Sequence, residues 1–260
     1  RASFEQMAKM VTVPKDVKCE PADAAGVRGE WIAAPGSVGH HVVLHLHGGG
    51  YVAGSIRTEK EFASRISRAS GARVLLIDYR LAPEAPFPAA LEDAVAAYRW
   101  LISSARIAPK NIVIEGDSAG GGLAIATLVR LRDAGVTLPV AAVCLSPCTD
   151  LAFTGESFKK NVEIDPFVTP EGAKFQARQY LGDDDPRNPL ASPFYADLHG
   201  LPPMLIQVWT SEILLDDSVR FADRAKRAGV DVKLDIWEDM IHVCQVFAAV
   251  VRECRQAIDK

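Results

Sequence analysis

The chain has 260 residues, of which 48% are hydrophobic and 24% charged, and its formal net charge is -4. This composition is that of an ordinary folded domain and excludes a disordered chain. No run of lysine and arginine is present, so we expect no nucleic-acid partner. The longest apolar runs are far shorter than the roughly 18 residues of a membrane span, so we expect no stable membrane insertion.

Helical and strand-like segments alternate along the chain. The first ten residues, with apolar side chains at spacings of three, predict a short amphipathic helix. Strands are predicted over 17–20, 27–33, 41–47, 72–77, 111–115, 140–145, 205–208 and 232–236. Helices are predicted over 59–70, 88–106, 123–134, 169–181, 218–228 and 243–258. The alternation predicts a mainly parallel eight-stranded sheet with helices on both faces, in a single α/β domain over 1–260.

One stretch, residues 151–203, interrupts this rhythm. It is polar and rich in proline, glycine and aspartate. We expect it to be an insertion that lies over the carboxyl ends of the strands as a lid or binding wall. The alternative is a passive surface excursion, because loops tolerate insertions. With residues 1–15 it would form a small helical cap.

The five cysteines are Cys19, Cys144, Cys148, Cys244 and Cys254, and their spacing matches no zinc signature. Cys144 and Cys254 lie in apolar periodic segments, so we expect buried free thiols. Free thiols favour a reducing compartment, and no secretory signal is visible, which predicts a cytoplasmic protein. The sequence begins at Arg1 and not at Met, so it does not show where the natural chain starts.

The strongest chemical signal is the run Gly116-Asp117-Ser118-Ala119-Gly120, which follows a predicted strand and precedes a predicted helix. It fits the G-x-S-x-G pattern of a nucleophile elbow, in which a sharp turn exposes the serine at the amino terminus of a helix. The alternatives are a glycine-rich turn and a phosphate-binding loop. No G-K-[ST] follows, which argues against the phosphate loop. We therefore expect Ser118 to be a nucleophile.

A second glycine run, Gly48, Gly49 and Gly50, follows the strand over 41–47. Consecutive glycines allow backbone N–H groups to turn towards a small anion, which is what an oxyanion hole requires. The partner donor in an α/β-hydrolase is the N–H after the nucleophile, here that of Ala119. The alternative is a flexible glycine turn.

A general base should follow the nucleophile in the sequence, and two histidines do so. His199 lies in a turn at the end of the insertion. His242 follows the last predicted strand, from where its loop can reach the elbow, so we expect His242 to be the base.

The acid should follow the next-to-last strand, where Glu212, Asp216 and Asp217 compete. Asp217 suits the first turn of a helix. Glu212 stands closest to the end of the strand.

Together these motifs resemble the bacterial hormone-sensitive lipase family of esterases. The resemblance rests on HGGGY at 47–51, DYRLAPE at 78–84, GDSAGG at 116–121 and the tail from Glu212 to His242, and it covers nearly the whole chain. In that family the triad acid lies about thirty residues before the histidine. Glu212 lies 30 residues before His242 and Asp216 lies 26, so the resemblance implies Glu212, with Asp216 as the alternative.

The resemblance implies further roles. Gly49 and Gly50 would supply oxyanion N–H groups with Ala119, Asp78 and Arg80 would form a scaffold pair, and two copies of the chain would pair through an edge strand as a homodimer. The chain departs from the family at Cys148, where an aromatic residue is common, and at Trp209, where glycine is common. We expect Tyr51, Cys148 and Trp209 to shape the substrate pocket.

These features predict a serine carboxylesterase that acts on small-molecule esters with short to medium acyl chains and needs no metal or organic cofactor. An amidase or lactonase would use the same triad, because pocket shape sets the leaving group. The alternative from another class is a non-catalytic small-molecule receptor on a hydrolase fold.

Overall fold

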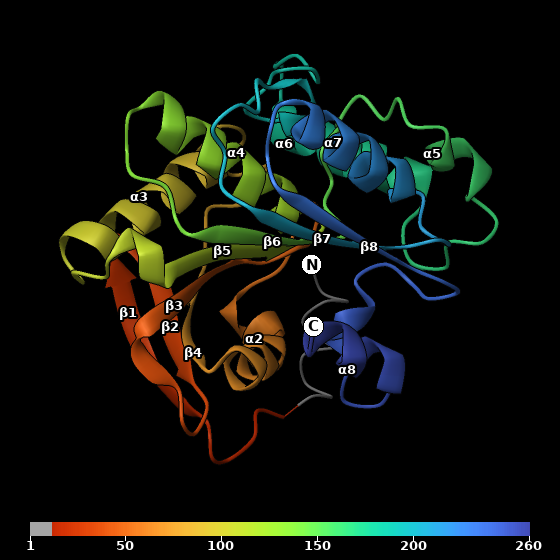
Figure 1. The fold of residues 1–260 in the computed structure, drawn as a ribbon. Coiled ribbons are helices and arrows are strands. Elements are labelled where there is room, and N and C mark those ends of the chain that lie inside the picture. Colours follow the sequence, from red (N-terminus) through yellow and green to blue (C-terminus); the bar gives the residue numbers. More distant parts are fainter. Residues whose placement is uncertain (1–11) are drawn as a thin grey trace.

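The computed structural model describes residues 12–260, and the described chain is built around one eight-stranded sheet (Figure 1). Its strands lie in the order β1-β2-β4-β3-β5-β6-β7-β8. They are β1 (Lys18–Ala24), β2 (Val27–Ala33), β3 (Val38–Leu46), β4 (Ala72–Ile77), β5 (Ile112–Asp117), β6 (Ala141–Leu145), β7 (Met204–Trp209) and β8 (Val232–Trp237). β2 is antiparallel to both β1 and β4, and the strands from β4 to β8 along the sheet are parallel. The predicted mainly parallel sheet is confirmed.

Helices cover both faces of the sheet, as predicted (Figure 1). On one face lie α2 (Ile56–Ser70) and α8 (Arg252–Ile258), and on the other lie α3 (Ala89–Ser103), α4 (Ala119–Asp133) and α7 (Leu215–Arg227). The central strands carry buried apolar side chains towards both faces, for example the successive residues Leu44 and Val43 of β3, which belong to different core clusters. Because helices exclude water from both faces of the sheet, both faces of the central strands are apolar. This accounts for the unbroken apolar runs in the sequence.

The edges of the sheet are β1 and β8, the strands through which the expected homodimer would pair; this pairing stays a prediction. Within residues 12–260, no helix combines the length and the hydropathy that crossing a membrane requires. The predicted amphipathic helix over the first ten residues lies outside the described residues.

Helix α4 begins four residues earlier than predicted, at Ala119 directly after the elbow. Glycines are poor helix formers, so the sequence from Gly120 to Gly122 does not predict a helix. The reason for these glycines is the close approach of α4 to the sheet. A Cβ at Gly120 would overlap the carbonyl oxygen of Leu46 in β3. Close packing of α4 against β3 therefore accounts for the glycines in the first turn of the helix.

The insertion over 151–203 contains a short helix α5 (Ser157–Lys160), the predicted helix as α6 (Pro170–Leu181) and a 3-10 turn η2 (Pro193–Tyr195). It contacts the segments that follow three different strands. Tyr180 stacks on Tyr51 after β3, Tyr195 donates to Asp150 after β6, and Asn161 donates to the backbone after β7. The insertion thus lies over the carboxyl ends of the strands, as expected.

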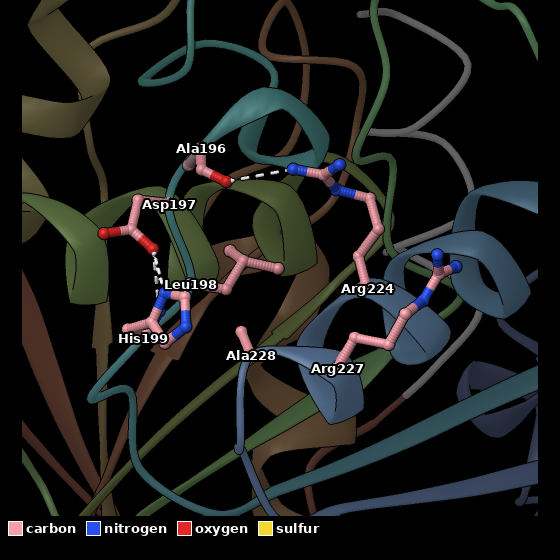
Figure 2. Close-up of a pocket in the computed structure, with 7 residues that line it drawn as sticks. All are labelled: Ala196, Asp197, Leu198, His199, Arg224, Arg227 and Ala228. Atoms are coloured by element: carbon pink, nitrogen blue, oxygen red, sulfur yellow. Dashed lines mark hydrogen bonds and ion pairs between the residues drawn. The ribbon is translucent and has the colours of Figure 1, made fainter.

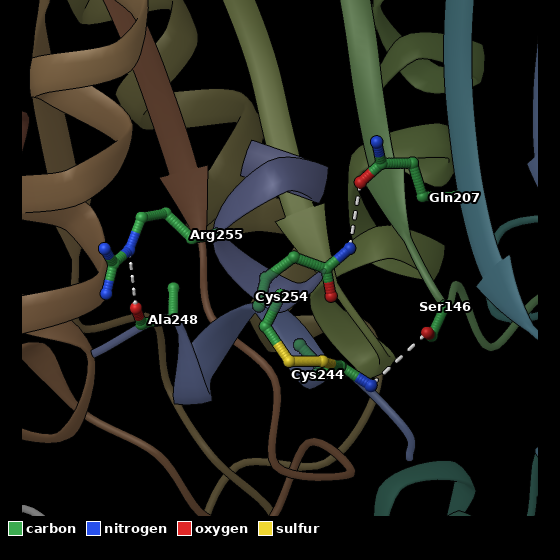
Figure 3. Close-up of a disulfide and its surroundings, with 8 residues drawn as sticks. Ser146, Gln207, Cys244, Ala248, Cys254 and Arg255 are labelled. Carbon is green, nitrogen blue, oxygen red and sulfur yellow. Dashed lines mark hydrogen bonds between the residues drawn. A yellow bond between two sulfur atoms is a disulfide. The ribbon is translucent and has the colours of Figure 1, made fainter. Parts of the chain in front are cut away.

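The C-terminal segment differs from the predicted single helix over 243–258. A 3-10 turn η3 (Cys244–Phe247) is followed by a break and then by α8. Val243 has a left-handed backbone, with φ +47°, which no regular helix accommodates. A disulfide joins Cys244 to Cys254 across the break, with the two Cα atoms 5.2 Å apart (Figure 3).

The disulfide corrects the expected state of the cysteines. Cys254 is not a free thiol, whereas Cys144 is free and buried as predicted. Disulfides persist in oxidising surroundings, so this bond removes the argument for a reducing compartment. The location of the protein stays a prediction.

The expected scaffold pair of Asp78 and Arg80 is also wrong. Arg80 donates to Asp93 in α3, with Nε to Oδ1 at 2.9 Å, and Asp78 accepts the N–H of Ile56 at the start of α2 at 2.6 Å. The two residues lie in one motif but anchor different helices, because they follow β4 at the edge where helices from both faces begin.

We predict that Gly120→Ala destabilises the fold by about 3 kcal/mol or more, because the added methyl group overlaps a backbone atom that cannot move aside. Thermal unfolding followed by circular dichroism measures the effect. Gly39→Ala is the matched control, since a Cβ there meets no atom within 4 Å. Equal melting temperatures for the two variants would contradict this account of α4.

Candidate active site

Ser118 sits at the turn between β5 and α4 with a backbone that L-residues seldom adopt, at φ +52° and ψ -119°. Such a conformation costs energy and persists only where the surroundings impose it. It projects the half-buried serine side chain from the carboxyl edge of the sheet, at the amino terminus of a 15-residue helix. The positive end of the helix dipole therefore faces the place where the serine would react.

The structure brings together Ser118, His242 and Glu212, which are far apart in the sequence. Nε2 of His242 lies 2.8 Å from Oγ of Ser118, and Nδ1 lies 2.6 Å from Oε2 of Glu212. His242 stands in the loop after β8, and Glu212 in the loop after β7. These distances let Nδ1–H donate to the carboxylate, which leaves the Nε2 lone pair directed at the serine hydroxyl.

Glu212 is fully buried and its second oxygen is also occupied. Oε1 accepts the hydroxyl of Ser146 at 2.6 Å and the N–H of Trp209 at 2.8 Å. Three donors thus hold the carboxylate in one orientation. No sequence motif points to Ser146, which follows β6 and stands two residues before Cys148. A serine in an S-P-C turn gives no sequence signal for a partner 66 residues away.

The environment of His242 adjusts its basicity. Burial acts to lower the pKa of His242, but the charge and hydrogen bond of Glu212 outweigh it, so the pKa is raised above the usual 6.5. Asp165 and Asp117 act in the same direction. The neutral imidazole, the form that could accept a proton, therefore predominates only above this raised pKa.

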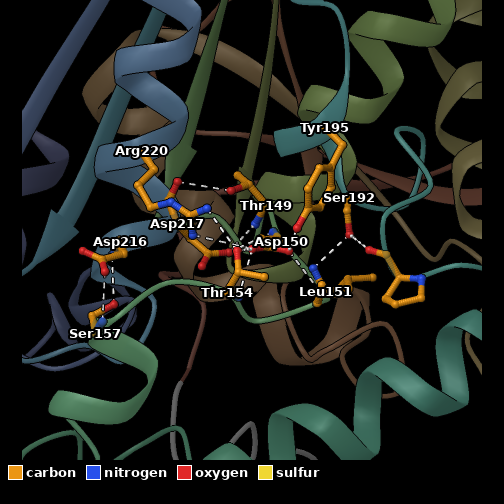
Figure 4. A network of polar contacts seen from close by, with 12 residues as sticks. Thr149, Asp150, Leu151, Thr154, Ser157, Ser192, Tyr195, Asp216, Asp217 and Arg220 are labelled. Atoms are coloured by element: carbon orange, nitrogen blue, oxygen red, sulfur yellow. Dashed lines mark hydrogen bonds and ion pairs between the residues drawn. The ribbon is translucent and has the colours of Figure 1, made fainter.

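The other two carboxylates considered for the acid have different partners (Figure 4). Asp216 accepts the N–H of Ser157 at 2.9 Å. Asp217, in the first turn of α7 as expected, accepts the N–H groups of Thr149 and Asp150 at 2.8 and 2.9 Å. Burial and the neighbouring Asp150 raise the pKa of Asp217 to about 7. Asp216 therefore anchors the insertion to α7, and Asp217 anchors the segment that follows β6.

The insertion also forms hydrogen bonds with the loop that carries Glu212. The side-chain amide of Asn161 donates to the carbonyl oxygens of Thr210 and Glu212 at 3.0 and 2.8 Å. Asp165 accepts the N–H of Ile213 at 2.9 Å. The sequence does not predict either contact, because polar residues in a polar insertion give no sign of which loop they contact.

The backbone N–H groups expected to form the oxyanion hole are not all without an acceptor. The N–H of Gly48 donates to Asp117 at 2.9 Å, so the expectation that Gly48 supplies an oxyanion donor is wrong for this group. The N–H groups of Gly49, Gly50 and Ala119 pair with no acceptor in the described part of the chain. Gly49 and Gly50 have positive φ values of +111° and +63°, which the turn requires.

The three residues expected to shape the substrate pocket lie in different surroundings. The N–H of Cys148 donates to the carbonyl of Ser118 at 2.9 Å, so Cys148 adjoins Ser118. Tyr51 is 2% exposed and stacks on Tyr180, with ring centroids 3.7 Å apart. Trp209 is fully buried with the Cys244–Cys254 disulfide and Trp237. Their roles in the pocket stay predictions.

His199, the other histidine after the serine, lies on a separate surface (Figure 2). Its Nδ1 lies 2.6 Å from Asp197 Oδ1, and both side chains are largely exposed. They line a hollow of about 240 Å³ with Ala196, Leu198, Arg224, Arg227 and Ala228. This hollow includes none of the residues around Ser118.

One group of side chains in the described chain could offer three ligands to a metal ion. His45, Glu59 and Asp117 are buried, and their ligand atoms lie within 4.8 Å of one another. They lie next to the elbow, on β3, α2 and β5.

The chain is similar in sequence and structure to known hydrolases and esterases. A family model described as alpha/beta hydrolase fold matches residues 43–246. The acetyl-hydrolase of Streptomyces hygroscopicus is 44% identical over 230 residues, which cover 88% of this chain and 76% of that protein. The esterase of Acinetobacter venetianus is 36% identical over 259 residues, covering 99% and 85%. The crystal structure of an esterase from the bacterial hormone-sensitive lipase family superposes with a TM-score of 0.98 at 52% identity, covering 100% of this chain and 87% of that one.

A serine elbow at the carboxyl edge of a mainly parallel sheet, followed in the chain by a carboxylate and a histidine, defines an α/β-hydrolase. Within that fold, the chain belongs to the bacterial hormone-sensitive lipase family of esterases, as the motifs predict.

We predict that Glu212→Gln lowers the pKa of His242, because the variant removes the charge that opposes the effect of burial. A titration of the imidazole resonances by NMR measures it, and the wild-type value should lie above 6.5. Asp216→Asn is the matched control and should leave the titration unchanged. An unaltered His242 titration in Glu212→Gln would show that this carboxylate does not control the base.

Proposed function

We propose that this protein hydrolyses carboxylic esters with short to medium acyl chains through an acyl-enzyme formed on Ser118. The observation that carries the proposal is the chain of contacts from Ser118 through His242 to Glu212, together with the N–H groups of Gly49, Gly50 and Ala119, which have no acceptor within residues 12–260. The relatives support the same chemistry, since those compared above are named as esterases or an acetyl-hydrolase.

In the first step His242 removes the hydroxyl proton while Oγ of Ser118 attacks the ester carbonyl. The 2.8 Å contact between Nε2 and Oγ provides a direct path for this proton. Glu212 keeps the imidazole in the tautomer that accepts at Nε2 and stabilises the imidazolium that forms.

Negative charge then develops on the carbonyl oxygen of the substrate. The N–H groups of Gly49, Gly50 and Ala119 can donate to it, and the amino terminus of α4 faces it. The loss of one such donor typically costs about 3 kcal/mol in the barrier. His242 next protonates the leaving alcohol, and a water molecule repeats the sequence on the acyl-enzyme and frees Ser118.

Two observations favour short to medium acyl chains. The insertion over 151–203 is polar and contains no long apolar lid segment. The relative from Streptomyces hygroscopicus is named an acetyl-hydrolase. Cys148 beside Ser118 and the stacked pair of Tyr51 and Tyr180 are the side chains that we propose to limit the acyl group.

We predict that Ser118→Ala lowers kcat on p-nitrophenyl butyrate by at least about 10⁴-fold with little change in stability, because only the nucleophile is removed. Rates on p-nitrophenyl acetate, butyrate and palmitate, each corrected for spontaneous hydrolysis, test the acyl range, and palmitate should be the slowest. Wild-type-like rates in Ser118→Ala would refute the nucleophile. A wild-type protein inactive on all three esters would favour a receptor, an amidase or a lactonase.

A further inference from the structure

Side chains of the insertion hold the loop that carries Glu212. We call residues 210–216, which lead from β7 into α7, the acid loop. Near its end, the hydroxyl of Ser157 donates to the carbonyl oxygen of Ile213 at 2.8 Å. The same hydroxyl accepts the N–H of Asp216 at 2.9 Å (Figure 4). The start of the insertion is therefore fixed to the end of the acid loop.

Asn161 bonds to the part of the acid loop that contains Glu212. Its side-chain amide donates to the carbonyl oxygen of Thr210 at 3.0 Å and to that of Glu212 at 2.8 Å. Both partners are acceptors, so the atom that faces them must be a donor, and the amide nitrogen supplies two N–H groups. The backbone carbonyl of Asn161 also accepts the N–H of Asp165 at 2.9 Å, in the turn that brings Asp165 to the same loop.

Asp165 bonds to the residue that follows Glu212. The side chain is buried, with 7% of the residue exposed. Oδ2 accepts the N–H of Ile213 at 2.9 Å. Oδ1 accepts the N–H groups of Phe167 and Val168 at 2.9 and 3.0 Å. One carboxylate therefore joins the turn of the insertion to the acid loop, through bonds that its charge strengthens.

The acid loop determines where the carboxylate of Glu212 lies. Oε2 of this carboxylate is 2.6 Å from Nδ1 of His242, and the orientation of the imidazole depends on that contact. Ser146 and the N–H of Trp209 bind Oε1 and so fix the rotation of the side chain. The contacts from the insertion fix the backbone instead. A displacement of about 1 Å in such a group can cost about 10²-fold in rate.

We propose that Asn161 and Asp165 are positioning residues for the proposed triad, because they hold the backbone around Glu212 and thereby the carboxylate that orients His242. The insertion is then part of the catalytic machinery as well as a cover over the strand ends. Residues 157–165 should stay in place when substrate enters, since a lid motion of this segment would displace the acid. The inference rests on the proposed function, because it assigns these contacts to the triad of that reaction.

The first test is the variant Asn161→Asp. It keeps the size of the side chain, but it removes both N–H donors and places a carboxylate against two carbonyl oxygens. We expect kcat on p-nitrophenyl butyrate to fall by about 10- to 100-fold. KM should stay within about twofold, because the side chain acts through Glu212.

A proton resonance separates positioning from support of the fold. The Nδ1 proton of His242 lies in the short hydrogen bond to Glu212, so its NMR resonance reports on this contact directly. We expect the resonance to shift or broaden in folded Asn161→Asp. A loss of stability alone would lower the melting temperature and leave the resonance in place.

Asn188→Asp is the matched control. Asn188 is also half-buried in the insertion, but its amide donates to the side chain of Asp184, at 3.0 Å. This variant should keep the kcat and the resonance of wild type. Wild-type values of both in Asn161→Asp would overturn the proposal, even with a lowered melting temperature. If Asn161→Asp does not fold, Asn161→Ala, which removes the donors without adding a charge, replaces it.

The second test removes the charge of Asp165 and keeps the size of its side chain. The charged groups that face His242 are Glu212 of the acid loop, Asp165 of the insertion and Asp117 of β5, and each raises the pKa of His242. In Asp165→Asn the acid limb of kcat/KM should therefore move to lower pH. Asp185→Asn is the control, because Asp185 also accepts the N–H two residues on but is exposed. An acid limb and a kcat that stay at wild-type values in Asp165→Asn would refute the role of Asp165.

Failure of the proposed function has a different signature. It would appear as full activity in Ser118→Ala, whereas the Nδ1 proton resonance of His242 does not depend on turnover. An unchanged resonance in the Asn161 variants, with activity lost in Ser118→Ala, would refute this inference and leave the proposed function standing.

Discussion

The close approach of α4 to β3 is the constraint on which the rest of the structure depends. A side chain at Gly120 would overlap the carbonyl of Leu46, and one at Gly116 would overlap the carbonyl of Gly120. With neither present, the ends of β3 and β5 lie close together, and the loop over residues 47–51 packs on Asp117, the residue before Ser118. The strained φ of Ser118 persists because this packing imposes it. The hydroxyl and the proposed oxyanion donors are thus positioned by backbone contact before any substrate binds.

His242 and Glu212, the proposed base and acid, are held in a different way, by segments far apart in the chain. Asn161 of the insertion donates to the backbone of the loop that carries Glu212. The hydroxyl of Ser146, after β6, donates to Glu212 and accepts the N–H of Val243. The Cys244–Cys254 disulfide joins the segment after His242 to α8. Packing and crosslinking of loops therefore supply the precision that catalysis requires.

The sequence predicts the sheet and the elbow well, because alternating apolar runs and the G-D-S-A-G pattern depend on local order. It fails where contacts join distant segments. The apolar period over 243–258 suggests one helix, since periodicity does not reveal the left-handed Val243 or the disulfide. The pairing of Asp78 with Arg80 fails because adjacent motif residues anchor different helices. The roles of Ser146 and Gly48 depend on partners that only the tertiary structure identifies.

The most direct test of the account is covalent labelling with a fluorophosphonate, followed by peptide mass spectrometry. The reagent forms an Oγ–P bond and releases fluoride, while His242 takes the hydroxyl proton. The account predicts one adduct per chain, on Ser118, and a much slower reaction in His242→Ala. An adduct on another residue, such as Cys148, or an equal labelling rate in His242→Ala would contradict the central claim that Ser118 is the activated nucleophile.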